Sequence, residues 1–375
     1  MKKVLTIGSG TQDIFIEHKG TESMSLVNKS GSIQYALFES GEKIEVKNIL
    51  YYTGGGSTNS SVSFKRLGFD ATCFCQIGND IEGKLILEKL EKEKVNIKSI
   101  KKTKKYQSGK SFIIKSQQGE RTIFAYRGAN AFVIKSQMPF DEIKKQDFIY
   151  ITSLSNNSAE LLPEIVKFAK KNKVGVAINP GISQLTKGTL ILKKSLKYID
   201  TFILNSTEAK QFMIALIESD ENYKNLLKSS REKITLNTKK NPSLIENPII
   251  YENINFSIYK FFKEVLKMGP KTVVITDGAN GVYVGTKKEI LFHPSIKTKV
   301  IDTVGAGDSF GSCFVASLYL KNKIEDALRF GIINSSSVIS KIGAKTGLLS
   351  LEKIKEKAKK LNTKLLKKYH FKMGA

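Results

Sequence analysis

Asp302-Thr-Val-Gly-Ala-Gly-Asp308-Ser-Phe310 is the stretch that decides how this chain is interpreted. Its glycine turn ends on a carboxylate, and an apolar segment that runs to Leu320 follows at once. The apolar segment predicts a buried helix that starts at Asp308 or Ser309. Glycines let consecutive backbone N–H groups point into one concave turn, and a helix start carries partial positive charge. The stretch therefore suits an anion such as a phosphate group.

Asp308 is hard to explain as a ligand of that anion, because a carboxylate repels a phosphate group. It is easier to explain as the base that takes a proton from a hydroxyl group attacking the phosphate. The backbone N–H groups of Gly305, Ala306, Gly307 and Asp308 would then surround the phosphoryl oxygens during transfer. An ordinary capped helix after a glycine turn explains the same residues without chemistry, and the motif alone leaves both interpretations open.

Six further motifs accompany this stretch, and each is weak by itself. In chain order they are Val4–Asp13, Gly54–Asn59, Ile77–Gly83, Arg127–Asn130, Asn205–Glu208 and Val273–Gly281. With Asp302–Phe310 they resemble the PfkB (ribokinase-like) family of sugar and nucleoside kinases, in family order and at plausible separations. The resemblance covers about residues 1–348.

The family resemblance implies one PfkB-type kinase domain over residues 1–375, built as a ribokinase-like three-layer α/β sandwich with a mostly parallel central sheet flanked by helices. The residue pattern agrees, because strand-like runs alternate with helical patterns, as in βαβ units. We expect strands at Val4–Ile7, Ala71–Gln76, Phe148–Ile151, Val174–Ile178, Thr201–Leu204, Val273–Thr276 and Val282–Val284. We expect helices at Ser57–Leu67, Gly83–Glu93, Ala159–Lys171, Thr207–Glu218, Ser257–Lys267, Ser309–Tyr319, Lys323–Ile339 and Leu351–Tyr369.

Two stretches interrupt this alternation, at about residues 14–52 and 100–127. The first carries short β-like runs, and residues 111–126 read as a hairpin around a Gln-Gln-Gly turn. From the residues alone these are two β insertions. In the resembled family they pair into a small β lid over the sugar, and a homodimer through that lid is one arrangement to expect. A third stretch, about residues 219–256, is polar in large part and reads as an exposed insertion.

The resemblance also implies the residues that bind the phosphate acceptor: Asp13, Gly54, Gly55, Gly56, Asn59 and Arg127. Asp13 would accept hydrogen bonds from two sugar hydroxyls, while the glycines let the ring approach the backbone. Arg127 would meet an anionic group of the substrate or pair with protein. Taken by themselves, Asp13 also reads as a turn or cap residue and Asn59 as a helix cap.

ATP with Mg²⁺ is the phosphate donor that the resemblance implies, with nucleotide contacts at Asn205, Thr276, Gly278, Gly281 and Asn334. Glu208 completes an Asn-x-x-Glu motif that the family associates with Mg²⁺, mostly through water, and Mg²⁺ prefers oxygen ligands and retained waters. Asp302 and the Ile339–Lys345 segment resemble the loops that bind a monovalent cation such as K⁺ in several members. Capping by Asn205 and Glu208, and a plain hairpin turn after Thr276, are the structural alternatives.

The function implied is an ATP-dependent kinase that transfers the γ-phosphoryl group to a primary hydroxyl of a sugar or related small carbohydrate, with Asp308 as the base. An adenosine-type nucleoside kinase of the same fold and a non-catalytic carbohydrate-binding member are the alternatives. No residue selects one substrate; Ser153 lies near where ribokinases tend to have a sugar-binding glutamate. No P-loop signature follows any expected strand, which disfavours that other class of kinase.

Composition adds limits to this interpretation. The 375 residues carry a net charge of +26, but only five of the 61 basic residues are arginines, and the lysines are spread along the chain. We therefore expect a solvated lysine-rich surface and no specific nucleic-acid binding. The three cysteines have apolar neighbours and read as free thiols. Without an apolar run of 18 residues, we expect no membrane span and a cytoplasmic enzyme.

Overall fold

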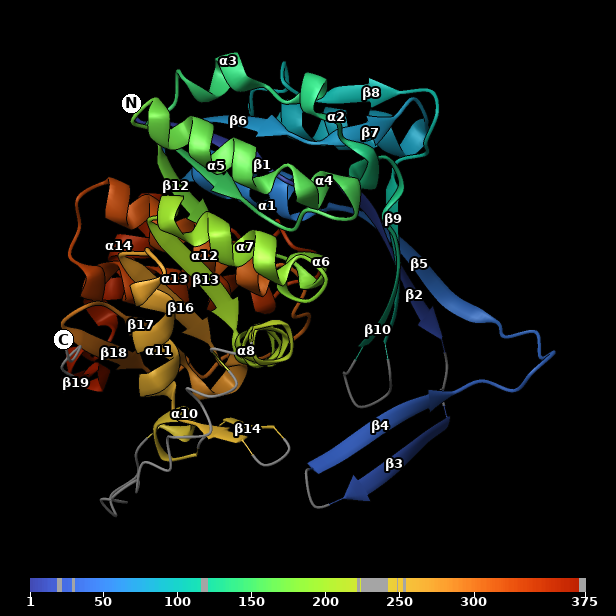
Figure 1. Ribbon diagram of the computed structural model, residues 1–375. Coiled ribbons are helices and arrows are strands. Elements are labelled where there is room, and N and C mark those ends of the chain that lie inside the picture. Colours follow the sequence, from blue (N-terminus) through green and yellow to red (C-terminus); the bar gives the residue numbers. More distant parts are fainter. Residues whose placement is uncertain are drawn as a thin grey trace.

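The structure is a computed structural model that describes residues 1–18, 22–28, 31–115, 121–220, 223, 242–247, 249–251 and 254–370. Its centre is a nine-stranded sheet with the strand order β19-β18-β17-β16-β13-β12-β11-β1-β6 (Figure 1). The strands are β1 (Lys3–Ile7), β6 (Asp70–Phe74), β11 (Phe148–Ile151), β12 (Gly175–Ile178), β13 (Thr201–Asn205), β16 (Thr272–Thr276), β17 (Val282–Gly285), β18 (Glu289–His293) and β19 (Lys367–His370). The six strands from β16 to β6 are parallel, and β17 to β19 pair antiparallel.

Helices cover both faces of this sheet, so the predicted three-layer sandwich is confirmed (Figure 1). One face packs against α5 (Leu162–Lys171), α7 (Thr189–Ser195), α8 (Ser206–Ser219) and α11 (Ile258–Lys267). The other packs against α1 (Gly56–Arg66), α12 (Ala306–Tyr319), α13 (Ile324–Ile339) and α14 (Leu351–Lys360). Strands covered on both faces must be apolar throughout, which is why these strands appeared in the sequence as continuous apolar runs.

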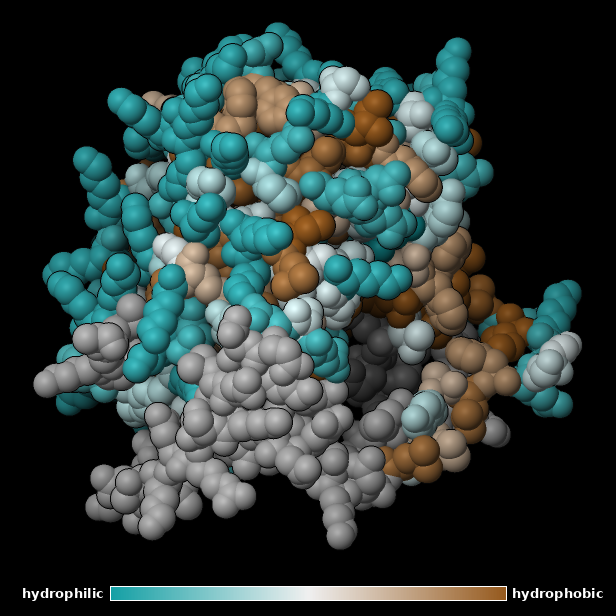
Figure 2. Space-filling view, in the orientation of Figure 1, coloured by the Kyte–Doolittle hydropathy of each residue, from teal (hydrophilic) through white to brown (hydrophobic). Residues whose placement is uncertain are grey.

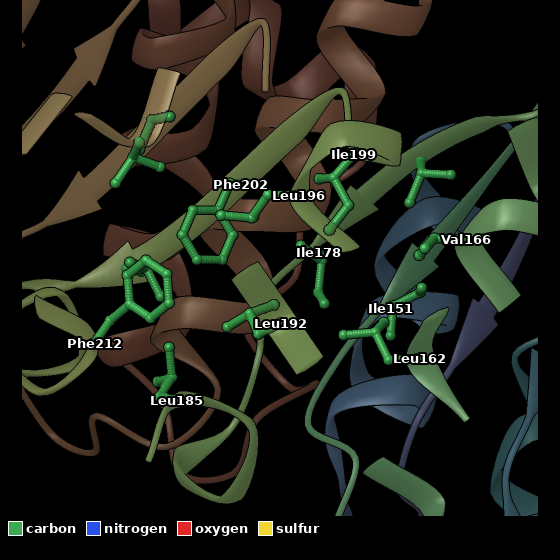
Figure 3. Packing of buried hydrophobic residues seen from close by; sticks show 14 of the residues in the cluster. Ile151, Leu162, Val166, Ile178, Leu185, Leu192, Leu196, Ile199, Phe202 and Phe212 are labelled. Atoms are coloured by element: carbon green, nitrogen blue, oxygen red, sulfur yellow. The ribbon is translucent and has the colours of Figure 1, made fainter. Parts of the chain in front are cut away.

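Figure 3 shows the first of these two cores, where sheet residues Ile178 and Phe202 lie beside Leu192 and Phe212 of the helices. Further elements complete the body: β7 (Gln76–Gly78), α2 (Ile81–Lys92), β8 (Lys101–Thr103), α3 (Phe140–Ile143), α4 (Asn157–Glu160) and α6 (Ile182–Leu185). All three cysteines are free and buried. Within the described ranges, no helix has the length and apolarity needed to cross a membrane.

A second, four-stranded sheet extends from the body beside the ends of β1 and β6 (Figure 1). We call it the side sheet; its order is β10-β9-β2-β5, formed by β2 (Thr11–His18), β5 (Val46–Gly54), β9 (Gly109–Lys115) and β10 (Arg121–Tyr126). Because β2 pairs with β9 in parallel, the two β insertions expected from the sequence form one sheet. The hairpin of β3 (Glu22–Asn28) and β4 (Gly31–Leu37) lies beyond it.

The C-terminal end differs from the expectation of one helix over Leu351–Tyr369. Helix α14 ends at Lys360, and β19 adds to the sheet by pairing with β18. Only Ile354 of α14 is buried, so a longer lysine-rich helix would gain little packing. The edge of β18 instead offers backbone hydrogen bonds.

The insertion expected at about residues 219–256 is only partly described, because residues 221–222 and 224–241 lie outside the described residues. Its later part is not simply an exposed loop. Helix α10 (Ser243–Glu246) packs Leu244 and Ile245 against the first core, and β14 (Ile249–Tyr251) pairs with β15 (Ile254–Phe256). The expectation that the whole insertion is solvated is therefore too broad, since its leucine and isoleucine bury apolar surface.

Candidate active site

The glycine turn that starts at Gly305 leads directly into α12, which begins at Ala306. Gly305 has a φ of 78°, in the left-handed region, and a Cβ at this position would lie 2.4 Å from that of Ala344. Only glycine fits there. The N–H of Ala306 donates to the carbonyl oxygen of Thr303 at 3.3 Å, whereas the next N–H groups of a helix start lack intrahelical acceptors, and the space beside the α-carbon of Gly307 is open. This is the local geometry that an anion-binding turn requires, and anion binding itself stays a prediction.

Asp308 lies in the first turn of α12, where it contacts a residue that is 249 positions away in the sequence. Its Oδ2 accepts a 2.8 Å hydrogen bond from Nδ2 of Asn59, near the start of α1. Burial raises the pKa of Asp308 to about 6, although the hydrogen bond from Asn59 and the charge of Lys345 act to lower it. Such a carboxyl group is a stronger base than an ordinary aspartate, yet it is still ionised at neutral pH.

Asp13 lies on β2 with its carboxylate over the backbone of Gly54. A Cβ at Gly54 would lie 1.9 Å from Oδ2 of Asp13, so a side chain there would displace the carboxylate. Oδ1 of Asp13 accepts a 3.0 Å hydrogen bond from the hydroxyl of Thr11. Burial raises the pKa of Asp13, while Lys345 and the hydroxyls of Thr11 and Ser111 oppose that rise. Thr11 and Ser111 are neighbours of Asp13 that the sequence argument did not identify.

The other two glycines of the Gly54–Asn59 motif allow close packing. Gly55 has a φ of 93°, and a Cβ there would lie 2.5 Å from the carbonyl oxygen of Ser9. A Cβ at Gly56 would lie 2.6 Å from the side chain of Thr152. These approaches hold the start of α1 against the loops after β1 and β11, and Asn59 of the same helix hydrogen-bonds to Asp308. Direct contact of Gly55 and Gly56 with a substrate stays a prediction.

Lys345 is a site residue that sequence reasoning missed. Its side chain is buried, and Nζ lies 2.6 Å from Oδ1 of Asn59 and 2.6 Å from the carbonyl oxygen of Thr53. Burial lowers the pKa of Lys345 to about 8, although Asp13 and Asp308 act to raise it. The sequence named Lys345 only as the last residue of the Ile339–Lys345 segment, which resembles a monovalent-cation loop, and gave no signal of its burial or its contacts.

Arg127 is exposed at the end of β10, and no hydrogen bond or ion pair joins its side chain to another described residue. Its backbone is held by Asn130, whose Nδ2 donates to the carbonyl oxygens of Arg127 and Gly10. Oδ1 of Asn130 accepts from the N–H of Gly10. The Arg127–Asn130 motif therefore fastens the side sheet to the end of β1. A contact between Arg127 and a substrate anion stays a prediction.

On the other side of α12 lies a cavity of about 500 Å³. The residues around it include three expected nucleotide contacts and the start of α12: Thr276, Gly278, Gly281, Ala306 and Gly307. Asn334 does not line this cavity. Its Nδ2 donates to the carbonyl oxygen of Ser309 and its Oδ1 accepts from the N–H of Leu349, so both ends of the amide hold the fold together. The neighbouring Ser335 and Ser336 face the cavity in its place.

Asn205 and Glu208 form a capping box at the start of α8. Oδ1 of Asn205 accepts from the N–H of Glu208, and Oε2 of Glu208 accepts from the N–H of Asn205, both at 2.8 Å. Burial raises the pKa of Glu208; its hydrogen bond with Asn205 opposes this, while the nearby charge of Asp308 adds to it. In the described part of the chain, no three His, Cys, Asp or Glu side chains cluster as ligands of a metal ion. One carboxylate fits Mg²⁺ only if water and phosphate oxygens complete the coordination.

Asp302, the residue expected to bind a monovalent cation, is buried between two loops. Its Oδ1 accepts a 3.1 Å hydrogen bond from the N–H of Val304, and its Oδ2 accepts a 3.0 Å bond from the N–H of Gly343. Asp302 thereby joins the turn before α12 to the loop after α13. These bonds give it a structural role, and the cation stays a prediction.

Comparison with known proteins shows the family of this chain. The sequence profile of the pfkB family carbohydrate kinases matches residues 24–238 and 257–351. The ribokinase of Staphylococcus aureus is 27% identical over 322 residues, which cover 84% of this chain and 91% of that protein. The 5-dehydro-2-deoxygluconokinase of Listeria monocytogenes is 26% identical over 311 residues, with coverage of 81% and 86%.

Solved structures show the same fold. The ribokinase of Arabidopsis thaliana complexed with ribose and ATP matches with a TM-score of 0.72 at 19% identity, over 96% of this chain and 99% of that one. The nucleoside kinase of Methanocaldococcus jannaschii matches with a TM-score of 0.69 at 19% identity, again over 96% and 99%. The fold is therefore ribokinase-like. This chain belongs to the pfkB family of carbohydrate kinases, and it is accordingly a phosphotransferase with an alcohol group as acceptor.

Proposed function

We propose that this chain is an ATP-dependent kinase that phosphorylates a primary hydroxyl group of a sugar or related small carbohydrate, with Asp308 as the base. The observation that carries the proposal is the position of Asp308 at the start of α12. Asp308 has Asn59 as its hydrogen-bond partner on one side, and the cavity of about 500 Å³ lies on the other side of the same helix start. The reacting hydroxyl of an acceptor bound next to Asp13 would be close both to Asp308 and to a phosphate group at the start of α12.

The side chains divide the work of phosphoryl transfer. Asp13 would accept hydrogen bonds from two hydroxyls of the acceptor and so orient the third, reacting hydroxyl toward Asp308. Asp308 would take the proton of that hydroxyl as its oxygen bonds to the γ-phosphorus, while the bond from that phosphorus to the bridging oxygen breaks and ADP leaves. The N–H groups at the start of α12 would hold the phosphoryl oxygens, whose charge they stabilise without reorganisation. The gain comes from placement and charge, since phosphoryl transfer needs little covalent help from protein.

Glu208 is the carboxylate that would hold Mg²⁺ through water beside the phosphates. When bound, Mg²⁺ supplies charge neutralisation on the phosphate oxygens. The raised pKa of Glu208 supports this role, because a partly buried carboxylate next to Asp308 lacks a cationic partner in the described structure. Asn205 keeps Glu208 in position through the capping box.

The test is a panel of acceptors scored by ATP consumption: pentoses, fructose, ketodeoxy sugar acids, phosphorylated hexoses and nucleosides. We expect at least one acceptor to accelerate ATP consumption in the wild-type chain and not in Asp308→Asn. If every acceptor left ATP consumption at the level of that variant, the chain would be a non-catalytic member of the family and the proposal would be wrong.

A nucleoside kinase of adenosine type is the second candidate, because the described fold serves kinases of both kinds. The same panel separates the two, since a sugar kinase would prefer free carbohydrates to nucleosides in kcat/KM. An acceptor that carries a carboxylate or phosphate would point to the exposed Arg127. Arg127→Ala would then raise KM for that acceptor only.

The side sheet supports a further proposal, in which it covers the acceptor and joins two copies of the chain. On the face away from Asp13, the strand register aligns exposed apolar side chains: Ile49, Tyr51, Phe112 and Phe124. Figure 2 shows apolar side chains gathered along this sheet, whereas hydrophilic ones cover most of the helical body. An apolar patch rimmed by polar residues is typical of a protein interface.

Light scattering during gel filtration tests this interface. We expect a mass near twice 41.8 kDa for the wild-type chain and a monomer mass for the double variant Tyr51→Lys, Phe124→Lys. Leu190→Lys, at an exposed apolar residue of α7, is the matched control and should not change the mass. A wild-type monomer at micromolar concentration would contradict the dimer and leave the catalytic proposal intact.

A further inference from the structure

Lys345 contacts strand β5 through Thr53 and helix α1 through Asn59. These elements lie on the side of the site where we place the phosphate acceptor, which we call the acceptor side. Its Nζ donates to Oδ1 of Asn59 at 2.6 Å, and the Nδ2 of the same amide donates to Oδ2 of Asp308 at 2.8 Å. A second hydrogen bond of Nζ, also 2.6 Å long, goes to the carbonyl oxygen of Thr53 just before Gly54. The three side chains thus form one chain of hydrogen bonds from the buried ammonium group to Asp308.

The amide of Asn59 has two chemically different ends, and Lys345 decides which end meets Asp308. An ammonium group only donates, so it must face the amide oxygen. The NH₂ end is then directed at Asp308, where it donates to the carboxylate. With the amide turned around, its oxygen would face the carboxylate and its NH₂ group would face the ammonium, so both charges would lose the hydrogen bond that the amide now provides.

The backbone around Lys345 is fixed independently of its side chain. Arg66, in the last turn of α1, donates to the carbonyl oxygens of Lys345 and Leu348 at 3.0 and 2.9 Å, and it pairs with Glu93. Helix α1 therefore contacts the loop after α13 twice. Arg66, near the C-terminal end of the helix, binds the backbone of the loop, and Asn59, near its N-terminal end, binds the side chain of Lys345. A buried, anchored lysine of this kind does not belong to the solvated lysine surface of the chain.

We propose that Lys345 is a positioning residue of the kinase, which orients Asn59 toward Asp308 and fastens the base of the side sheet through Thr53. This inference rests on the proposed function and extends it. It assigns to the acceptor side a buried cation, Lys345, that acts on Asp308 through the side chain of Asn59. Lys345 does not itself touch the reacting atoms. Its charge lies among Asp13 of β2, Asp308 of α12, Cys73 of β6 and Lys89 of α2.

Lys345→Met is the decisive variant, because methionine has nearly the length of the lysine stem and fills its space without the charge or the hydrogen-bond donors. We expect kcat/KM for the acceptor to fall about tenfold or more, while KM for ATP changes less than about twofold. Loss of the nearby cation disfavours the ionised form of Asp308, so the acidic limb of the pH profile should move to higher pH. Lys341→Met, at an exposed lysine of the same loop, is the matched control.

Lys345→Gln separates charge from geometry, because glutamine keeps a neutral donor for the amide oxygen of Asn59. It should recover part of the kcat lost in Lys345→Met and keep the shifted acidic limb. If Lys345→Met does not fold, this second variant tests the proposal through the same pH shift. Kinetics and a pH profile of Lys345→Met or Lys345→Gln equal to those of Lys341→Met would overturn the positioning role.

Hydrogen exchange of the substrate-free protein keeps the inference testable if no acceptor is turned over. Faster exchange at Thr53–Asn59 in Lys345→Met, and not in Lys341→Met, supports the role of Lys345 even then, whereas equal exchange in both variants overturns it. A wild-type chain without phosphotransfer would count against the proposed function alone. The two proposals can therefore fail separately.

Discussion

The two sides of the helix start at Ala306 are built in contrasting ways. The acceptor side consists of the buried polar side chains of Asp13, Asn59 and Lys345 and the half-buried Asp308. Hydrogen bonds join Lys345 to Asn59 and Asn59 to Asp308. The side that we propose for the nucleotide is a cavity whose wall combines apolar side chains with glycines, threonines and serines, and the amide of Asn334 is turned away from it. One side is organised by charged side chains, the other by backbone shape.

This contrast indicates where substrate selectivity lies. A carboxylate that is partly desolvated binds a hydroxyl strongly and rejects a ligand that leaves it unpaired, so the acceptor side discriminates sharply. An apolar cavity with few charged groups recognises the shape of a flat base and discriminates less. Substitutions on the acceptor side should therefore change rate and specificity, and those on the nucleotide side should mainly change affinity for ATP.

The largest effect is expected at Asp308, where the two sides meet. Asp308→Asn keeps the size of the side chain but removes the proton acceptor, so kcat should fall by a factor of about 100 or more, with ATP affinity within a few-fold. Steady-state kinetics and nucleotide titration measure both quantities. Asp141→Asn, at an exposed aspartate far from the site, is the control. An Asp308→Asn variant that retained more than about a tenth of the wild-type rate would contradict the base role.

Asp13→Ala should produce the next largest effect, and only on the acceptor side. It removes a charged acceptor of hydroxyl hydrogen bonds, each of which contributes about 1.5–3 kcal/mol. We expect KM for the acceptor to rise and kcat/KM to fall, with KM for ATP nearly unchanged. Calorimetric titration with the accepted substrate checks the binding part. Unchanged acceptor affinity would make Asp13 a structural residue of the side sheet.

A pH profile tests the same contrast without a substitution, because only the acceptor side depends on the ionisation of Asp308. Burial raises the pKa of Asp308 from its ordinary 3.8 to about 6. The base is therefore ionised above pH 6 and protonated below it, so kcat/KM should fall about tenfold for each unit below pH 6. ATP binding, measured separately, should show no inflection at that pH. A rate that stayed constant down to pH 4.5 would show that Asp308 titrates like an ordinary aspartate.

Sequence reasoning predicted the fold well because the alternation of strands and helices is local, whereas the site depends on distant contacts. The glycine turn and Asp308 stood out in the local sequence, although the motif alone left an ordinary capped helix open and the family resemblance favoured the catalytic interpretation. Lys345 did not, because what distinguishes it from the other lysines is burial against α1, a tertiary property. Asn334 was assigned to the nucleotide, but the turn of α13 on which it lies directs its amide at Ser309 and Leu349 instead. A sequence motif therefore identifies a residue but does not predict the direction of its side chain.

The smallest effects are expected on the nucleotide side, at the insertion. Ser243 of α10 donates a 2.8 Å hydrogen bond to Asp277, in the turn between Thr276 and Gly281. Ser243→Ala removes one hydrogen bond of about 1 kcal/mol, so KM for ATP should rise about fivefold at most, with the acceptor unaffected.

A pair of deletions then separates the parts of the insertion. Replacing residues 229–241 by a short glycine-serine linker should change neither the melting temperature nor KM for ATP, because that polar segment has a composition typical of solvated loops and loop length costs little. Extending the deletion to Asn253 removes α10, whose Leu244 and Ile245 pack against the core, and should lower the melting temperature and weaken ATP binding. Thermal unfolding and ATP titration of both variants provide the measurement. If the short deletion alone abolished ATP binding, the insertion would be integral to the nucleotide side, and selectivity there would depend on more than backbone shape.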